Sequence, residues 1–485
     1  MESIRPQLSL TSFIGRFRDT KIVMLLFAFT FFLRLLYLDY YPLNIDEPFT
    51  VFYSQMSFDH IGEMLKTENN PPLFFVIMHF WINAFGISEF SVRFLPALFS
   101  ALTVVFVYFI GNKFFSVKVA VASAVLFIFS ESQFEFAHDC RAYSLLVLLS
   151  TISIYFLLKL LILEKDRINW IFFGLCNTLL VYTHFIGWII IFVEIVVIIS
   201  EVRFSKLKHF AVSFTITLLS LIPYLSIFFK RVTETTSKDT WVQKPQLSDL
   251  YSRLWEYSNK PVVTVVFLIV LFAGFGLLIK QKNKIDLQTR AMLLWFLIPY
   301  LGLFLISMKL PLFIERYLLV ISIPFYILLG SFAVLISSKS KAFRFLYLFF
   351  PLLMLLTTNL NPSRIRPNKQ IVYLVQNMKR TPTTAILINP DWYAPTFLYY
   401  YDKEMFCDYS HSTEKLNANG IFPLGSYEEL VKQEEFKKYN RIVYFQSNPN
   451  LVDFENRNLN FLKSSFNYIS TVKAFNCKIS ILNRN

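Results

Sequence analysis

Two adjacent carboxylates, Asp46 and Glu47, follow an apolar run that ends near residue 39 and is long enough to cross a membrane. They lie in the segment "NIDEPFTVFYSQ" (44–55). A carboxylate at such a position can take a proton from an incoming hydroxyl group, which is general-base catalysis. Without a chemical role, the pair would be a solvated loop or a helix cap. The elements around it decide between these interpretations.

Two arginines could complete a site for phosphate chemistry. Arg141 lies in "ESQFEFAHDCRAYS" (131–144) and Arg316 in "KLPLFIERY" (309–317), and both are expected at helix ends. A guanidinium group can grip two phosphate oxygens at once. Together with a carboxylate base, these residues predict the transfer of a group away from a phosphate.

The composition predicts a polytopic α-helical membrane protein. Hydrophobic residues make up 55% of the 485 residues and charged residues only 16%, with 55 Phe. Apolar runs of roughly 20 residues recur, which is the length that spans a bilayer core. The net charge of +14 comes from short basic clusters between these runs. Such clusters are typical of cytoplasmic loops, so no nucleic-acid partner is expected.

The basic clusters predict a topology of about eleven transmembrane helices. With every cluster placed in the cytoplasm, an even number of crossings must separate one from the next. The run at 168–201 could be one long helix, but the charge pattern favours two, with a turn near "YTHF" (182–185). The segment 71–86 is expected to lie in the outer interface. The predicted crossings are 22–39, 92–111, 118–135, 143–162, 168–183, 185–201, 210–229, 262–280, 290–308, 314–336 and 342–359.

This topology gathers the candidate residues on one side. The first loop (41–91), 131–144, 230–261 and 309–317 all face outward. Two domains are expected: a transmembrane domain, 1–359, and a small extracytoplasmic α/β domain, 360–485. In the second, "NKQIVYLVQNMK" and "SYEELVKQEEFKKY" have helical periodicity, whereas "TAILINP", "RIVYFQS" and "CKISILN" predict strands. Cys407 and Cys477 are expected as free thiols, with pairing as the alternative.

The outer side limits the chemistry. Nucleotide donors are not supplied there, and the 12 Gly form no GxGxxG or Walker loop. An enzyme on this side needs an activated donor that is delivered through the membrane, and a polyprenyl-phosphate sugar is such a donor. The alternative is a transporter or lipid-glycan flippase of similar helix count, but its polar residues should lie near the membrane midplane. A polymerase or ligase of surface polysaccharide would differ only in its acceptor.

Three ordered blocks carry a family resemblance: "LRLLYLDYYPLNIDEPFT", "NNPPLFFVIMHFWINAFGISEFSVRFLPALFSALTVVFVYFIGNKFF" and "FEFAHDCRAYSLLVLL". They resemble the dolichyl-phosphate-mannose–protein mannosyltransferase-like enzymes, glycosyltransferase family 39, and bacterial relatives such as the aminoarabinose transferases, within the GT-C superfamily. "YTHFIGW" and "ERYLLVISIPF" match later, looser blocks, so the resemblance covers roughly residues 30 to 330. It implies a GT-C-type helical bundle and an inverting glycosyltransferase that uses a polyprenyl-phosphate sugar and an extracytoplasmic acceptor.

The resemblance also implies roles for individual residues. Asp46 matches the catalytic base and Glu47 its partner. Arg141 falls in a block often written Glu-x-Arg-x-Tyr, in which Arg suits the lipid phosphate. The other donor-phosphate residues are Arg316 and Tyr143, and the acceptor or supporting residues are Asp139, Asn70, His138 and Arg34.

A divalent metal is left open, and no cofactor is assigned. Relatives with a metal use a carboxylate and a His, for which Glu68, His138 and His184 are candidates. Asn70 replaces the His of a His-Pro-Pro block, so a metal role at that point is in doubt. Glu194 lies inside an apolar helix, where an acid is costly, so it is either a functional group or a structural hydrogen-bonding group. The expected location is the inner membrane of a bacterium, multi-pass, with the site and the C-terminal domain extracytoplasmic.

Overall fold

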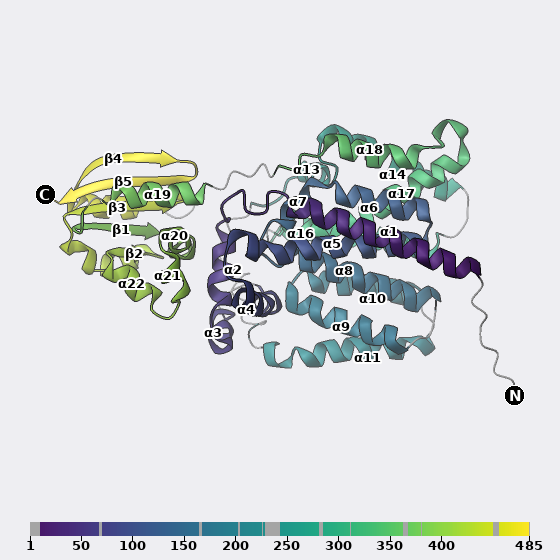
Figure 1. The fold of residues 1–485 in the computed structure, drawn as a ribbon, viewed down its shortest axis with the longest axis horizontal. Helices are drawn as coiled ribbons and strands as arrows, with labels where there is room; N and C mark the ends of the chain where they lie inside the picture. Colours follow the sequence, from purple (N-terminus) through teal and green to yellow (C-terminus); the bar gives the residue numbers. More distant parts are fainter. Residues whose placement is uncertain are drawn as a thin grey trace.

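The structure is a computed structural model that describes residues 10–66, 70–163, 167–201, 204–225, 227, 243–280, 285–310, 312–361, 367–379, 381–449 and 455–484. A helical bundle occupies the first part, and a domain with a five-stranded sheet occupies the second (Figure 1). Both predicted parts are therefore present as structural units.

Each predicted crossing overlaps one or more helices of the bundle, so the helical assignments are confirmed for the described residues. Residues 226 and 228–229 of the predicted crossing 210–229 lie outside them. The run at 168–201 is two helices separated by a turn at residues 184–186, as the charge pattern predicts. The bundle helices are α1 (Leu10–Leu35), α5 (Glu89–Phe114), α6 (Val117–Ile128), α7 (Glu131–Ala137), α8 (Tyr143–Leu158), α9 (Arg167–Thr183), α10 (Gly187–Glu201), α11 (Phe204–Ser220), α14 (Pro261–Lys280), α15 (Leu287–Ser307), α16 (Glu315–Leu318), α17 (Ser322–Lys339) and α18 (Leu346–Thr357).

By length and composition, five helices within the described ranges can cross a bilayer, and the bent pair α6 and α7 would make six. The pair bends by 60°, so the single span predicted for 118–135 is wrong in its geometry. Ser130 explains the break, because its side chain caps α7 by accepting a hydrogen bond from the backbone N–H of Gln133. Helices α9, α10 and α11 have 17, 15 and 17 residues and are shorter than an upright span needs.

Three short helices of the first loop lie at the end of the bundle that faces the sheet domain (Figure 1). They are α2 (Asp46–Ser54), α3 (Phe58–Met64) and α4 (Leu73–Phe85). Helix α4 falls within the segment 71–86 that was expected to lie in the interface. It buries Phe74 and Met78 and exposes Phe80 and Phe85, so one of its faces is available to lipid.

The C-terminal domain is a mixed sheet with helices α19 (Asn368–Met378) and α20 (Ala394–Tyr401) on the side of the bundle (Figure 1). Its strands are β1 (Thr384–Asn389), β2 (Ile421–Pro423), β3 (Arg441–Ser447), β4 (Phe466–Ala474) and β5 (Cys477–Arg484), in the spatial order β2-β1-β3-β5-β4. Strands β1, β2 and β3 are parallel, and β5 pairs antiparallel with β3 and β4. The three predicted strands are confirmed.

Smaller elements connect these parts: η1 (Lys159–Leu163), η2 (Ile222–Tyr224), α13 (Asp249–Trp255), η3 (Leu319–Ile321), η4 (Lys341–Phe343), η5 (Asp391–Tyr393), α21 (Lys403–Cys407), α22 (Ser412–Ala418), α23 (Tyr427–Lys432), η6 (Glu435–Lys438) and α25 (Arg457–Lys463). All four cysteines are free thiols, and Cys407 is exposed. The expectation that Cys407 and Cys477 are free thiols is therefore confirmed.

Strand β1 is buried on both faces, and its side chains alternate between two cores. Ala385 and Leu387 belong to a core within the C-terminal domain. Ile386 and Ile388 belong to a cluster that continues through α19 and α20 into α2 and the bundle. The sheet domain is thus packed onto the first loop by a shared apolar core.

Candidate active site

Asp46 is the first residue of α2, directly after the irregular segment that leaves α1. Its Oδ2 lies 3.1 Å from Nη1 of Arg316, and its side chain is 44% exposed. Asp46 is therefore an accessible carboxylate, as a base for an external hydroxyl would have to be.

Glu47 points the other way, because successive helix residues are about 100° apart. Its side chain is fully buried and accepts four hydrogen bonds. Arg93 donates two of them, at 2.8 Å each, and the backbone N–H groups of Asn44 and Cys140 donate the others. These bonds occupy both carboxylate oxygens, so Glu47 supports the site from behind and is not placed to touch substrate.

Arg93 of α5 is the matching support, and the sequence interpretation did not include it. Its five N–H groups all have acceptors: two go to Glu47, and three go to the carbonyl oxygens of Leu38, Tyr41 and Pro42. A buried guanidinium is stable only with such complete pairing. The pair therefore fixes the segment before Asp46 and, through the N–H of Cys140, the residue before Arg141.

Arg141 and Arg316 both reach Asp46. Nη1 of Arg141 donates to Oγ1 of Thr50 at 2.8 Å and to the carbonyl oxygen of Asp46 at 3.4 Å. The guanidinium of Arg316 also lies over the rings of Tyr143 and Tyr317, at 5.9 and 5.5 Å. The predicted base and the two predicted phosphate-binding arginines thus come from three distant segments and meet at one place.

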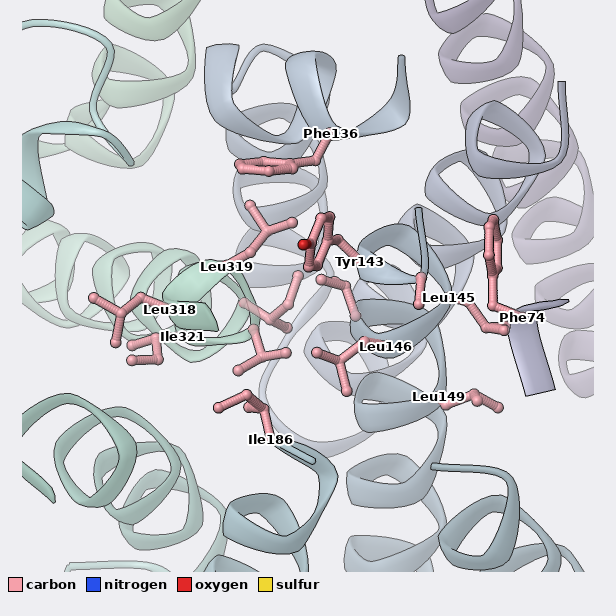
Figure 2. Close-up of a cluster of buried hydrophobic side chains, with 14 of the residues drawn as sticks. Phe74, Phe136, Tyr143, Leu145, Leu146, Leu149, Ile186, Leu318, Leu319 and Ile321 are labelled. Carbon is pink, nitrogen blue, oxygen red and sulfur yellow. The ribbon is translucent and has the colours of Figure 1, made fainter. Parts of the chain in front are cut away.

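An apolar layer lies next to this charged cluster. Figure 2 shows the ring of Tyr143 beside Leu319, with Phe136 above them and Leu146 and Ile186 below them in this view. The rings of Tyr143 and Phe136 pack edge to face at 5.4 Å between centroids. Such a layer excludes water from one side of the charges and so strengthens their interactions.

His184 stacks on Tyr143 and Tyr317 in the turn between α9 and α10. Its Nδ1 accepts a hydrogen bond from the backbone N–H of Ile186, so the neutral ring carries its proton on Nε2. Burial, with the charges of Arg141 and Arg316, lowers the pKa of His184 to about 3. His184 is therefore a neutral side chain beside the two arginines.

The supporting residues proposed from the sequence have mixed positions. Arg34 is fully buried in the bundle, where it donates to Ser100 and to the carbonyls of Ile128 and Phe127, so it is a structural residue. His138 donates from Nε2 to the carbonyl oxygen of Arg34 at 2.8 Å and is also structural. Asp139 is buried, and its carbonyl accepts from the N–H of Arg141 at 2.6 Å. Asn70 lies half-buried ahead of α4.

The metal candidates do not form a site in the part of the chain that the structure describes. No cluster of three or more His, Cys, Asp or Glu side chains suited to a metal occurs there. Glu68 lies outside the described residues. His138 and His184 each use one ring nitrogen for the hydrogen bond already given.

Glu194 lies deep in the bundle, away from the charged cluster. It is fully buried on α10, and Oγ of Ser153 lies 2.5 Å from its Oε1 and 3.0 Å from Oδ1 of Asn177. Side chains from α8, α9 and α10 thus meet in one polar contact. This arrangement agrees with the structural interpretation of Glu194.

Comparison with known proteins gives the same picture of the fold. Residues 69–227 match the family model described as dolichyl-phosphate-mannose-protein mannosyltransferase, whereas no curated protein matches significantly. The solved structure of ArnT from Cupriavidus metallidurans bound to undecaprenyl phosphate is similar, with a TM-score of 0.60 at 11% identity over 95% of this chain and 98% of that one. The archaeal oligosaccharyltransferase AglB from Archaeoglobus fulgidus, in complex with an inhibitory peptide and a dolichol-phosphate, gives 0.55 at 10% identity over 94% and 74%. These likenesses confirm the expected fold class, a polytopic helical bundle with a small C-terminal sheet domain.

Proposed function

Since this chain has the GT-C fold and its family match indicates a membrane glycosyltransferase, we propose that it moves a sugar from a polyprenyl phosphate to an acceptor outside the cytoplasm. The observation that carries the proposal is the meeting of one accessible carboxylate, Asp46, with Arg141 and Arg316. A base for the acceptor and cations for the leaving phosphate are the two groups that this reaction needs.

In the proposed reaction, Asp46 takes the proton of the acceptor hydroxyl while the oxygen of that hydroxyl forms a bond to the anomeric carbon of the sugar. The bond from that carbon to the phosphate oxygen breaks, and its electron pair leaves with the polyprenyl phosphate. Attack from the face opposite the phosphate inverts the anomeric configuration. Arg141 and Arg316 hold the phosphate and offset the charge it gains.

The Asp46–Arg316 ion pair suggests how the site responds to the donor. When the donor binds, its phosphate gives the Arg316 guanidinium a second anionic partner beside the Asp46 carboxylate. Arg316 can then turn toward the phosphate and leave Asp46 open to the acceptor hydroxyl.

Two observations support a lipid-linked donor. The ArnT structure holds undecaprenyl phosphate, and the AglB structure holds a dolichol-phosphate together with a peptide. In this chain the charged cluster lies at one end of an apolar bundle, where a lipid phosphate could rest at the surface with its tail in the bilayer (Figure 1). The partners proposed are therefore a polyprenyl-phosphate sugar, an acceptor on the outer side and the bilayer.

The proposed domains are a catalytic transmembrane domain, 1–359, and an extracytoplasmic domain, 360–485, in the inner membrane of a bacterium. The sheet domain and the first loop lie at the same end of the bundle, so we place both on the same side of the membrane as the active site (Figure 1). A transporter would instead have its binding residues near the middle of the membrane.

A deletion strain gives the first test. Mass spectrometry of its glycans, glycolipids and glycoproteins should reveal one missing sugar, which the wild-type gene restores and the gene with Asp46→Asn does not. Sugar transfer by the purified protein from a matching synthetic polyprenyl-phosphate sugar should then follow. If the Asp46→Asn gene restores the sugar fully, the proposed chemistry is wrong and the transporter alternative gains support.

A further inference from the structure

We propose that the C-terminal domain, through Tyr400 and Asn368, helps to hold the segment that positions Asp46, in addition to Arg93. This inference rests on the proposed function, because it concerns the placement of the proposed base. Tyr400 and Asn368 are positioning residues in it: they act through the backbone before Asp46 and do not touch substrate.

The segment between α1 and α2, residues 36–45, has no regular secondary structure of its own beyond turns. Its buried backbone groups therefore need partners from elsewhere, since an unpaired buried amide is costly. Arg93 provides them from the bundle side, at the carbonyls of Leu38, Tyr41 and Pro42. Of the residues that follow, Leu43 and Ile45 are held from the opposite side.

Leu43 is fully buried, and the C-terminal domain binds both of its backbone polar groups, the N–H and the carbonyl. Its N–H donates to the hydroxyl oxygen of Tyr400 at 2.5 Å, and its carbonyl accepts from Nδ2 of Asn368 at 2.8 Å. The Tyr393 hydroxyl donates to Oδ1 of Asn368 at 3.1 Å, which fixes the amide with its nitrogen toward Leu43. Leu43 is thus clamped between α20 and α19.

A third bond reaches the residue next to Asp46. Oγ1 of Thr396 on α20 donates to the carbonyl of Ile45 at 3.0 Å. Helix α20 also packs on α2, which begins at Asp46, and the Tyr399 hydroxyl donates to the carbonyl of Ile87 just before α5. The domain therefore touches the catalytic segment and the helix that carries Arg93.

Two separate sets of contacts therefore hold the backbone around Asp46. Arg93 holds Glu47 and the carbonyls of Leu38, Tyr41 and Pro42. The C-terminal domain holds Leu43 and Ile45, so Asp46 is fixed only when both sets of contacts are in place. Loss of the Tyr400 and Asn368 contacts should let Asp46 move without altering Arg141 or Arg316. Small displacements of a reacting group cost large factors in rate, up to about a hundredfold per ångström.

The experiment uses the full chain in nanodiscs and examines Tyr400→Phe, Asn368→Ala and the variant that combines these two substitutions. Each is compared with the control variant Tyr401→Phe. Tyr401 is the matched control, because it is the next residue and its ring packs on Phe397. Tyr400→Phe keeps the aromatic ring and removes only the hydroxyl. Hydrogen exchange of the peptide containing Leu43 is measured first, because it does not depend on activity.

We expect faster exchange at Leu43 in Tyr400→Phe and unchanged exchange in Tyr401→Phe. The turnover number should fall at least about tenfold, while KM for the lipid donor stays within about twofold. The same substitution should add nothing to the loss caused by Asp46→Asn, because Tyr400 acts through Asp46.

Two results would overturn the inference: unchanged exchange at Leu43 in the folded double variant, or a Tyr400→Phe loss that simply multiplies with that of Asp46→Asn. If the wild-type protein transfers no sugar from any polyprenyl-phosphate donor, the proposed function fails instead. The exchange measurement then still decides whether the C-terminal domain holds the segment.

Discussion

Nη1 of Arg316 lies 3.1 Å from Oδ2 of Asp46, although 270 residues separate them in the chain. The contact joins the start of α2 in the first loop to α16 near the end of the bundle. It places a cation beside the proposed base before any donor is bound. Arg316 therefore serves two anions in this account, the carboxylate and the donor phosphate.

Arg→Lys at 141 or 316 should weaken use of the lipid donor. Lys keeps the charge but loses the planar fork that holds two phosphate oxygens. We expect KM for the donor to rise by about tenfold in each variant, which corresponds to the loss of one good hydrogen bond to a charged group. Steady-state kinetics with a synthetic polyprenyl-phosphate sugar measures this. Arg253→Lys is a control, because Arg253 pairs with Glu256 elsewhere on α13; unchanged donor kinetics in both site variants would remove the arginines from the site.

Glu47→Gln should reduce stability far more than Asp46→Asn. Glu47 is fully buried against Arg93, and removing one partner of such a pair typically costs about 3–5 kcal/mol. The Asp46 side chain is 44% exposed, so its loss should cost less than about 1 kcal/mol. Thermal unfolding in detergent measures both, and the Glu47→Gln/Arg93→Gln double variant should be less damaged than the sum of the singles. Equal melting temperatures for the two single variants would reject this assignment of roles.

Acid should destabilise the protein through His184. Its pKa is lowered to about 3 from the ordinary value of 6.5, mainly by burial. Between these values the unfolded chain binds a proton that the folded chain does not, so stability is present above pH 6.5 and falls as the pH drops toward 3. The slope from one such group is at most about 1.4 kcal/mol per pH unit. His184→Asn keeps an acceptor for the N–H of Ile186 and should flatten the melting profile between pH 6 and about 4; an unchanged slope would contradict the neutral assignment.

The topology predicts opposite sides for the sheet domain and the turn after α17. Cys407 is the exposed native thiol, so Cys407→Ser is the background for labelling. Thr413 and Lys341 are both exposed and lie in α22 and η4. A membrane-impermeant maleimide on intact cells should label Thr413→Cys, and Lys341→Cys should react only after permeabilisation. The reverse pattern would place the site in the cytoplasm.

Much of the fold followed from the sequence because membrane spans obey simple rules. Apolar length and basic clusters located the helices, including the break between α9 and α10. The bend between α6 and α7 was missed, because a serine cap inside an apolar run does not change its hydropathy. Strand β2 has only three residues, and the edge strand β4 carries exposed polar side chains, so neither has a strong apolar signal.

The site followed from the sequence only in part. Asp46, Arg141 and Arg316 were proposed because charged residues at helix ends stand out, and in the structure they lie close together. Arg93 was missed, although a charged residue inside an apolar helix is costly and calls for a partner. The contacts of Tyr400 and Asn368 with Leu43 join residues more than 300 positions apart. Such long-range pairing has no local signal in one sequence.

Sugar transfer by purified Asp46→Asn protein in nanodiscs tests directly whether Asp46 is the catalytic base. Asn has nearly the same shape as Asp but cannot take a proton, and general-base assistance is worth about 10²- to 10⁴-fold in rate. If Asp46 is the base, the turnover number of the Asp46→Asn protein should fall at least about a hundredfold. Its melting temperature and its binding of undecaprenyl phosphate should stay close to those of the wild type. Near-normal turnover of a folded Asp46→Asn protein would contradict it, and Asp46 would then be only the N-terminal residue of α2 and the partner of Arg316.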